Sequence, residues 1–313
     1  MSGPSPDRRA VGAAGGAAVL WATYYLFILA LPASENLAII LVTPILGGAI
    51  TLGVASVVDR VGLAECRRAL VHPRVIASGL LFVAFQFGAV LSTRSVGAVN
   101  TSLIVLASDV AGTPLLFALI SRGEGPRFRR PRFWAGVGII AFAGTLTIVA
   151  GGSPEPLSLA TLALGAPLFL VSSSFVVMTD SATRRLPMLV VLGVGPILVS
   201  GLAAVVAAWV VGPGVLVGSV APSTVAILLG MSALNYAAAP ALFFWSARRI
   251  SLVIPSILQA AIPVFTLVYV ASFGLQPVTA IGLIGVPLAF LGALIAVRTP
   301  PAGTQPPPTL PLP

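Results

Sequence analysis

The chain has little of what a water-soluble protein needs. Only 8% of its 313 residues are charged, against about 25% in an average soluble domain. It has no lysine, so all 17 of its basic residues are arginine, and only 8 residues are acidic. This is too little polar surface to cover a water-soluble body of this length. A soluble enzyme, a disordered chain and a secreted disulfide scaffold are therefore excluded.

Cysteine and histidine are almost absent as well. Cys66 is the single cysteine and cannot form an internal disulfide, and His72 is the single histidine. A metal centre needs several such ligands, so no metal site is expected. The sequence also has no phosphate-binding Walker loop, no aspartate-rich diphosphate motif and no Ser/His/Asp set. We therefore expect no cofactor, no catalytic residues and no coupling to ATP.

Hydrophobic residues make up 58% of the chain and gather in long runs. A membrane-spanning helix needs about 20 apolar residues, and in hydrocarbon every backbone polar group must be paired within the segment. The sequence therefore predicts an all-α polytopic membrane protein. Its ten transmembrane helices are expected at residues 10–31, 37–58, 75–91, 96–120, 133–150, 157–179, 188–211, 224–245, 252–273 and 278–297.

The arginines are distributed unevenly between the connectors. With the N-terminus in the cytoplasm, 16 of the 17 arginines fall on the cytoplasmic side and only Arg94 falls outside. This is the positive-inside pattern, so we expect a chain in the cytoplasmic (inner) membrane with both ends cytoplasmic. The basic charge then reflects topology, and no nucleic-acid partner is expected. A cleaved signal peptide at the N-terminus is the alternative, but the first run is longer than a usual signal core.

Two halves of the sequence resemble each other. Residues 82–109 align without gaps on residues 236–263, and Arg94 then matches Arg248. Each half holds five predicted spans, an odd number, so the second copy would enter the membrane upside down. Inverted repeats are a transporter architecture with the substrate site near the midplane, between the halves. We expect a cytoplasmic arm (1–9), two inverted five-helix repeats (10–151 and 152–298) and a Pro-rich cytoplasmic tail (299–313).

Several short stretches make the chain similar to a known family. They are Thr-Ser-Leu-Ile at 101–104, Glu124, Trp134, Gly136, Pro-Ser-Ile-Leu at 255–258 and Pro-Val-Phe at 263–265. On these residues the chain resembles the EamA-type transporters of the drug/metabolite transporter superfamily over nearly its full length. The resemblance implies two EamA repeats around a central cavity, with the fifth and tenth helices peripheral, and outward movement of small metabolites. The chain departs from the family pattern in having Asp109 where a proline is usual and Gln276 where a glutamate is common.

Asp109 is the only charged residue deep inside a predicted span. Such a placement costs about 2.5–3.5 kcal/mol on insertion scales, so these residues usually face a cavity or a partner. Helical spacing puts Ser102 on the same face, and the matching face of the ninth helix carries Ser256 and Gln259. The carboxyl could carry a proton or act as counter-ion to an amine-bearing substrate. Alternatively, it is neutral, hydrogen-bonds to a nearby Ser or Thr, and fixes helix packing.

Aromatic and amide side chains form a second group of candidates. Trp21 and Tyr25 share a face of the first helix, Gln86 lies in the third and Tyr236 in the eighth. An apolar pocket with a few polar groups is typical of small-molecule sites, whereas an interfacial belt or ordinary packing is the alternative. The predicted lining of a substrate or proton pathway is therefore Asp109, Ser102, Gln86, Tyr25, Trp21, Tyr236, Ser256 and Gln259.

The expected function is secondary active export of a small organic metabolite or drug-like compound by alternating access, with proton exchange at Asp109. A facilitator without ion coupling, an intramembrane lipid-modifying enzyme and a non-transporting membrane partner or sensor are the alternatives. The enzyme is disfavoured because no second acidic residue or histidine lies in the predicted spans to share catalysis. The expected partners are a small-molecule substrate and the lipid bilayer, and the spacing of Gly12 and Gly16 is compatible with a homodimer.

Overall fold

The computed structural model describes residues 7–121, 130–150, 159–217, 221–250, 252–275 and 280–297. These residues are almost entirely helical, and no strand occurs among them. Eight helical segments within them are apolar and long enough to cross a membrane. The chain is therefore an all-α membrane protein with several spans, as the sequence predicts. The Pro-rich tail, residues 1–6 of the arm, Glu124 and Gln276 lie outside the described residues.

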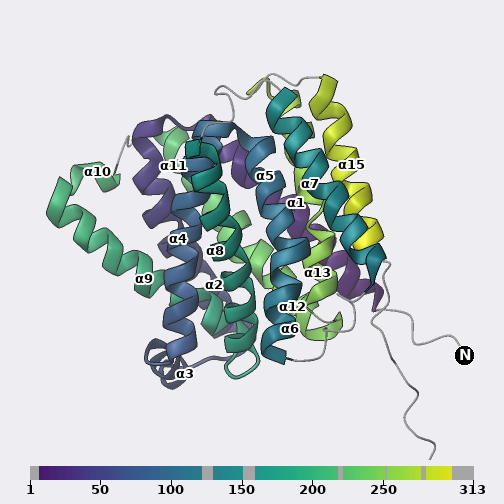
Figure 1. Ribbon diagram of the computed structural model, residues 1–313. Coiled ribbons are helices and arrows are strands. Elements are labelled where there is room, and N and C mark those ends of the chain that lie inside the picture. Colours follow the sequence, from purple (N-terminus) through teal and green to yellow (C-terminus); the bar gives the residue numbers. More distant parts are fainter. Residues whose placement is uncertain are drawn as a thin grey trace, which may run out of the picture.

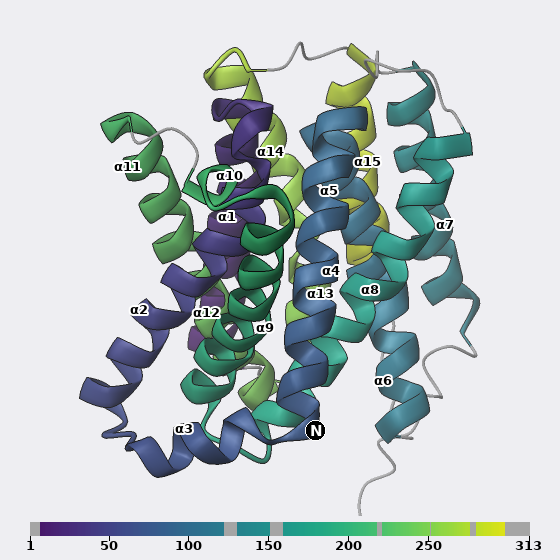
Figure 2. The ribbon, with the colours of Figure 1, turned by 90° about the vertical axis from the view of Figure 1, so that its left-hand side faces the viewer.

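The helices of the first half run along the long axis of a bundle, except for one that lies across its end (Figures 1 and 2). Asp7 precedes the first helix, and its carboxylate accepts a hydrogen bond from the Arg9 amide at 2.9 Å, which lowers the pKa of Asp7. The elements are α1 (Arg8–Ala30), η1 (Ala33–Glu35), η2 (Ala38–Val42), α2 (Thr43–Val58), the transverse α3 (Leu63–Leu70), α4 (Pro73–Val96), α5 (Ala98–Ala107), η3 (Ser108–Gly112), α6 (Thr113–Ser121) and α7 (Pro131–Ala150).

The second half continues the bundle and packs against the first. Its elements are α8 (Leu159–Thr183), α9 (Met188–Val211), α10 (Gly214–Val217), α11 (Pro222–Met231), η5 (Ser232–Ala238), α12 (Ala239–Ile250), α13 (Val253–Leu258), α14 (Ala261–Ser272) and α15 (Ala280–Val297). The segments η2, η3 and η5 are π-helical turns inside longer helices. Such turns widen the helix by one residue and are frequent at functional sites.

Each predicted span overlaps a helix, but the helices at the fifth and tenth predicted spans have shorter described apolar segments, Pro131–Ala143 and Leu283–Ala296, and are not among the eight. Some ends differ as well. The third span was expected to stop near residue 91, whereas α4 continues to Val96. Gly97, at φ +88°, then makes the whole connection to α5, a conformation that glycine adopts without strain. The sixth span was expected to end at residue 179, whereas α8 runs on to Thr183 and so includes Asp180. Apolar runs predict where a helix is buried in lipid, and a helix can continue beyond them.

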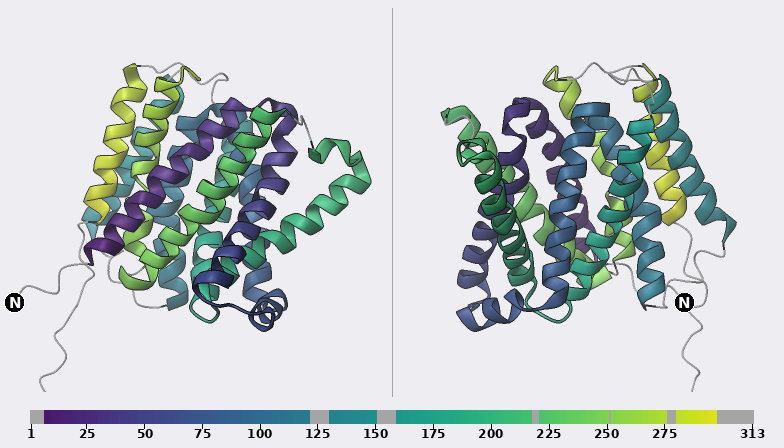
Figure 3. Two further views of the ribbon diagram at one scale, coloured as in Figure 1. Left: turned by 180° about the vertical axis from the view of Figure 1, so that it is seen from behind. Right: turned by 60° about the vertical axis from the view of Figure 1, so that its left-hand side comes forward.

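The outer surface of the bundle is strongly apolar. On α9, which slants away from the other helices (Figures 1 and 3), Trp209 is 87% exposed and Leu202 and Val205 are exposed as well. Leu283 and Ile284 are exposed on α15 in the same way. Polar side chains are instead buried among the helices, as Gln86, Ser102 and Asn235 are. This is the arrangement expected for a protein whose solvent is hydrocarbon.

Two helix pairs join the halves through direct contact of glycine backbones. Where α2 meets α9, a Cβ atom at Gly48 would lie 2.7 Å from the carbonyl oxygen of Gly193. Where α7 meets α15, a Cβ atom at Gly136 would lie 2.5 Å from the carbonyl oxygen of Gly292. Small residues let membrane helices approach closely enough for backbone packing. By contrast, Gly16 of the predicted dimer motif packs near Leu242 of its own chain.

We expect Gly48→Ala to destabilise the fold by about 1–3 kcal/mol, because the added methyl group has no room between α2 and α9. Gly53→Ala in the same helix is the matched control, since no atom lies within 4 Å of its Cβ position. The midpoint of thermal denaturation of the detergent-solubilised protein measures both. Equal midpoints for Gly48→Ala and Gly53→Ala would show that the contact does not limit packing.

Candidate functional site

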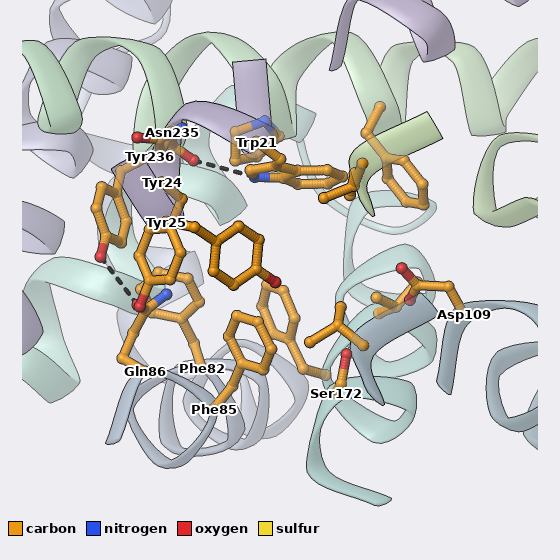
Figure 4. A pocket seen from close by; sticks show the side chains of 16 residues that line it. Trp21, Tyr24, Tyr25, Phe82, Phe85, Gln86, Asp109, Ser172, Asn235 and Tyr236 are labelled. Atoms are coloured by element: carbon orange, nitrogen blue, oxygen red, sulfur yellow. Dashed lines mark hydrogen bonds between the residues drawn. The ribbon is translucent and has the colours of Figure 1, made fainter. Parts of the chain in front are cut away.

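A cavity lies in the middle of the bundle, between helices of both halves (Figure 4). Its free volume is about 70 Å³, room for a few water molecules, whereas sites for drug-sized ligands have about 300 Å³ or more. A larger ligand would therefore require the helices to separate. The lining residues are Trp21, Tyr24, Tyr25, Phe82, Phe85, Gln86, Val105, Asp109, Ser172, Phe175, Val176, Asn235, Tyr236, Pro240, Phe243 and Ile262.

Half of the 16 lining residues are aromatic. Phe82 lies at the centre of one group, with ring centroids 5.2 Å from Phe175 and 5.6 Å from Tyr236. Trp21 and Phe243 form a second pair at 5.2 Å. Ring pairs at these separations attract each other beyond the effect of apolar burial. The wall of the cavity is thus built of mutually supporting rings.

Asp109 reaches the cavity from the π-helical turn η3. The preceding residue, Ser108, ties this turn to α8, because its hydroxyl lies 2.8 Å from the carbonyl oxygen of Phe169 and 2.7 Å from the hydroxyl of Ser173. A side chain at Gly112 would collide with Ser173, so the glycine allows the two helices to meet. These contacts hold Asp109 at a defined place on the cavity wall.

The carboxyl of Asp109 has no hydrogen bond or ion pair with any other described residue. Its side chain is only 6% exposed, and it extends toward the cavity, which Tyr25 lines from the other side (Figure 4). The alternative drawn from the sequence, a carboxyl held by a neighbouring Ser or Thr, does not match this arrangement. Asp109 is therefore a buried acid that is open to whatever occupies the cavity.

Gln86 connects three elements through one oxygen atom. The hydroxyl of Tyr24 on α1 donates to Gln86 Oε1 at 2.5 Å, and the hydroxyl of Tyr236 on η5 donates to the same atom at 2.9 Å. Gln86 itself lies on α4 and is 3% exposed. Two first-half helices are thereby joined to the second half at the cavity wall.

Trp21 and Asn235 form a second connection between the halves. The indole Nε1 of Trp21 donates to the carbonyl oxygen of Asn235 at 3.2 Å. The amide Nδ2 of Asn235 donates back to α1, to the carbonyl oxygen of Leu20 at 2.5 Å and to the hydroxyl of Thr23 at 3.1 Å. Asn235 lies in the π-helical turn η5, so both π-helical turns η3 and η5 contribute to the cavity.

Five of the eight residues predicted from the sequence line the cavity: Trp21, Tyr25, Gln86, Asp109 and Tyr236. Ser102, Ser256 and Gln259 are buried but do not line it. The Ser102 and Ser256 hydroxyls donate to the carbonyl oxygens of Val99 and Leu252, at 2.7 and 2.9 Å. Gln259 Nε2 donates to the carbonyl oxygen of Pro255 at 3.0 Å. Helical spacing finds the buried face, but the two hydroxyls are satisfied on their own helices. Gln259 Nε2 also donates to the carbonyl oxygen of Ala14 on α1 at 3.4 Å, and Gln259 Oε1 has no partner among the described residues.

Three features of the interior were missed from the sequence. Phe175 and Phe243 line the cavity although nothing distinguishes them from packing residues in the sequence; the only hint is that Phe175 follows a run of serines beginning at the lining residue Ser172. Asp180 is a second buried acid, 2% exposed, whose Oδ2 lies 2.7 Å from Nε of Arg184. It was missed because the predicted span ended one residue before it.

Comparisons with known proteins concern the fold alone. No family model matches this chain, and no curated protein matches it. A solved structure described simply as "Crystal structure of protein" is similar, with a TM-score of 0.65 and 18% sequence identity over 92% of this chain and 98% of its own. At this identity the likeness extends to the arrangement of the helices and not to function.

We expect Gln86→Leu to destabilise the protein by about 1–3 kcal/mol, because two buried tyrosine hydroxyls lose their acceptor. Combining it with Tyr24→Phe and Tyr236→Phe should restore most of the loss, since all three polar partners are then removed together. Thermal denaturation in detergent measures both variants. The network would have no structural role if Gln86→Leu alone denatured at the wild-type midpoint.

Proposed function

We propose that this chain is a secondary active transporter, similar to EamA-type members of the drug/metabolite transporter superfamily, which exports a small organic compound by alternating access. The observation that carries this proposal is the small central cavity, walled by aromatic rings from both halves and lined by Asp109, whose carboxyl has no partner among the described residues. Its small free volume suits an intermediate between two open states. Because the helices must separate to admit a substrate, transport and conformational change would be linked.

The proposed architecture is ten transmembrane helices in two inverted repeats, residues 10–151 and 152–298. Helix contacts support it. If the five spans of the first half are matched in order with the five of the second, α2 corresponds to α9 and α7 corresponds to α15. Each of these helices packs against its counterpart. In the same matching, α4 corresponds to α12 and α8 corresponds to α1. The contact between α4 and α8 should therefore have an equivalent between α12 and α1, and both contacts occur. A two-fold axis in the membrane plane would produce this pattern.

The paired arginines Arg94 and Arg248 give independent support. Arg94, at the end of α4, donates from Nη2 to the carbonyl oxygen of Leu31 at 2.7 Å, where α1 ends. Arg248, near the end of α12, donates from Nη2 to the carbonyl oxygen of Thr183, where α8 ends. Each arginine thus satisfies free carbonyl groups at the end of the first helix of its own half. Duplication and inversion account for one such arginine outside and one inside.

Asp109 is the proposed proton carrier. A carboxyl that faces a cavity in hydrocarbon is the usual proton relay of pumps and transporters. The other titratable groups that line the cavity are the hydroxyls of Tyr24, Tyr25 and Tyr236, and no lining residue is basic. Protonation and substrate binding at Asp109 would therefore depend on the same carboxyl, which would couple the export step to a proton gradient.

In proteoliposomes with an acidic interior, we expect wild-type protein to accumulate at least one compound from a panel of small organic molecules. Asp109→Asn should abolish the gradient-driven part because it cannot exchange a proton. Asp180→Asn, which changes a buried acid outside the cavity lining, is the matched control and should still accumulate the compound. Equal accumulation by wild type and Asp109→Asn would contradict proton coupling and favour a facilitator. Absence of any flux would favour a non-transporting membrane partner.

The topology has its own test, in which the cytoplasmic membrane and cytoplasmic ends are the proposed arrangement. Ser34 and Arg68 are exposed near opposite ends of α2. In a Cys66→Ser background, we expect a membrane-impermeant thiol reagent to label Ser34→Cys on intact cells and to label Arg68→Cys only after the membrane is opened. Labelling of both variants on intact cells would overturn the proposed orientation.

A further inference from the structure

The charge of the central cavity restricts what it can bind. Asp109 is the one acidic residue of the lining, no arginine or histidine is among the lining residues, and the chain contains no lysine. In a site surrounded by apolar side chains, charges are screened far less than in water. An anionic ligand would meet the carboxylate with no cation to offset it, so anions are disfavoured.

Several hydrogen-bond donors of the cavity are used within the protein. The hydroxyls of Tyr24 and Tyr236 both donate to Gln86, and the indole of Trp21 donates to the backbone of Asn235. A carboxylate or phosphate group is held best by charged donors, and no residue of this wall supplies one. A ligand that needs no donors from the protein fits it better.

The cavity is rich in what a cation needs. The faces of Trp and Tyr rings attract ammonium groups, and the attraction grows when the site is desolvated. Trp21 and Tyr25 line the same cavity as Asp109, whose carboxyl has no partner in the described part of the chain (Figure 4). A neutral ligand would leave that carboxyl, when ionised, without a counter-charge.

We propose that the cavity, widened as the helices separate, binds a small organic cation. Its substituted ammonium group lies between the Asp109 carboxyl and the rings of Trp21 and Tyr25. Its apolar body packs on Phe85 and Phe175, whose rings are stacked at 6.3 Å. This assignment rests on the proposed function in taking the cavity as the substrate site, and it adds the chemical class of the substrate.

Phenyltrimethylammonium is a suitable probe because its charge does not change with pH. Tert-butylbenzene has the same shape with carbon in place of the charged nitrogen, and benzoate carries the opposite charge. Radiolabelled phenyltrimethylammonium is bound to the full chain in lipid nanodiscs, and the other two compounds are added as competitors. We expect specific binding that neither competitor displaces at equal concentration. Displacement by benzoate, or no specific binding of the cation, would overturn the proposal.

The variants locate the binding. Asp109→Asn should weaken binding of the cation by about tenfold or more, the usual effect of losing a charged partner. Asp109→Glu should retain most of it, and Asp180→Asn should bind as wild type does. If Asp109→Asn does not fold, a comparison of Tyr25→Leu with Tyr25→Phe tests the same site. Only the leucine variant lacks the aromatic ring, so only it should lose affinity for the cation. Unchanged affinity in Asp109→Asn, or equal affinity in the two Tyr25 variants, would contradict the assigned site.

The same probe separates this proposal from the proposed function. Cation binding that depends on Asp109, without flux of the probe or of any panel compound in proteoliposomes, would refute transport and leave the binding site standing. Flux of neutral or anionic compounds alone, with the cation neither bound nor moved, would refute the substrate class and leave transport standing.

Discussion

Hydrocarbon offers no hydrogen bonds, so each polar group that this chain carries into the membrane must be satisfied inside the protein. Most of these groups are satisfied locally, as the hydroxyl of Thr51 is by the carbonyl oxygen of Gly47 at 2.8 Å. Others join separate helices, as Gln86 does with two tyrosines. Asp109 belongs to neither group, because no described residue bonds to its carboxyl, and a few buried hydroxyls, such as those of Ser200 and Thr266, also have no partner there. The Asp109 carboxyl therefore needs a partner from outside the protein, and the cavity is where a ligand can supply it.

Close backbone packing and π-helical turns together create that cavity. Glycines at the contacts of α2 with α9 and of α7 with α15 bring the halves near each other at two sides of the bundle. Between these contacts, η3 and η5 each insert an extra residue into a helical turn and direct Asp109, Asn235 and Tyr236 inward. The halves are therefore held tightly at their edges and meet through side chains at their centre. Such an arrangement suits a site that opens when one half moves against the other.

The arginines serve structure as well as topology. Their distribution between the connectors is the basis of the proposed orientation in the membrane. Arg94 and Arg248 in addition bind the carbonyl oxygens at the ends of α1 and α8. Both contacts lie within one half of the chain, so they strengthen each half without linking the two.

The sequence by itself determined that the chain is an all-helical membrane protein, roughly where its apolar helices lie, and that Asp109 is an acid placed in an apolar span. Hydropathy and helical spacing are local properties and can be read from neighbouring residues. Tertiary structure alone decided that Gln86 faces the cavity while Ser102 and Ser256 bond to their own helices. It also brought Phe243 beside Trp21, from far apart in the chain. The direction in which a buried side chain points depends on how distant helices pack, and no local pattern contains that information.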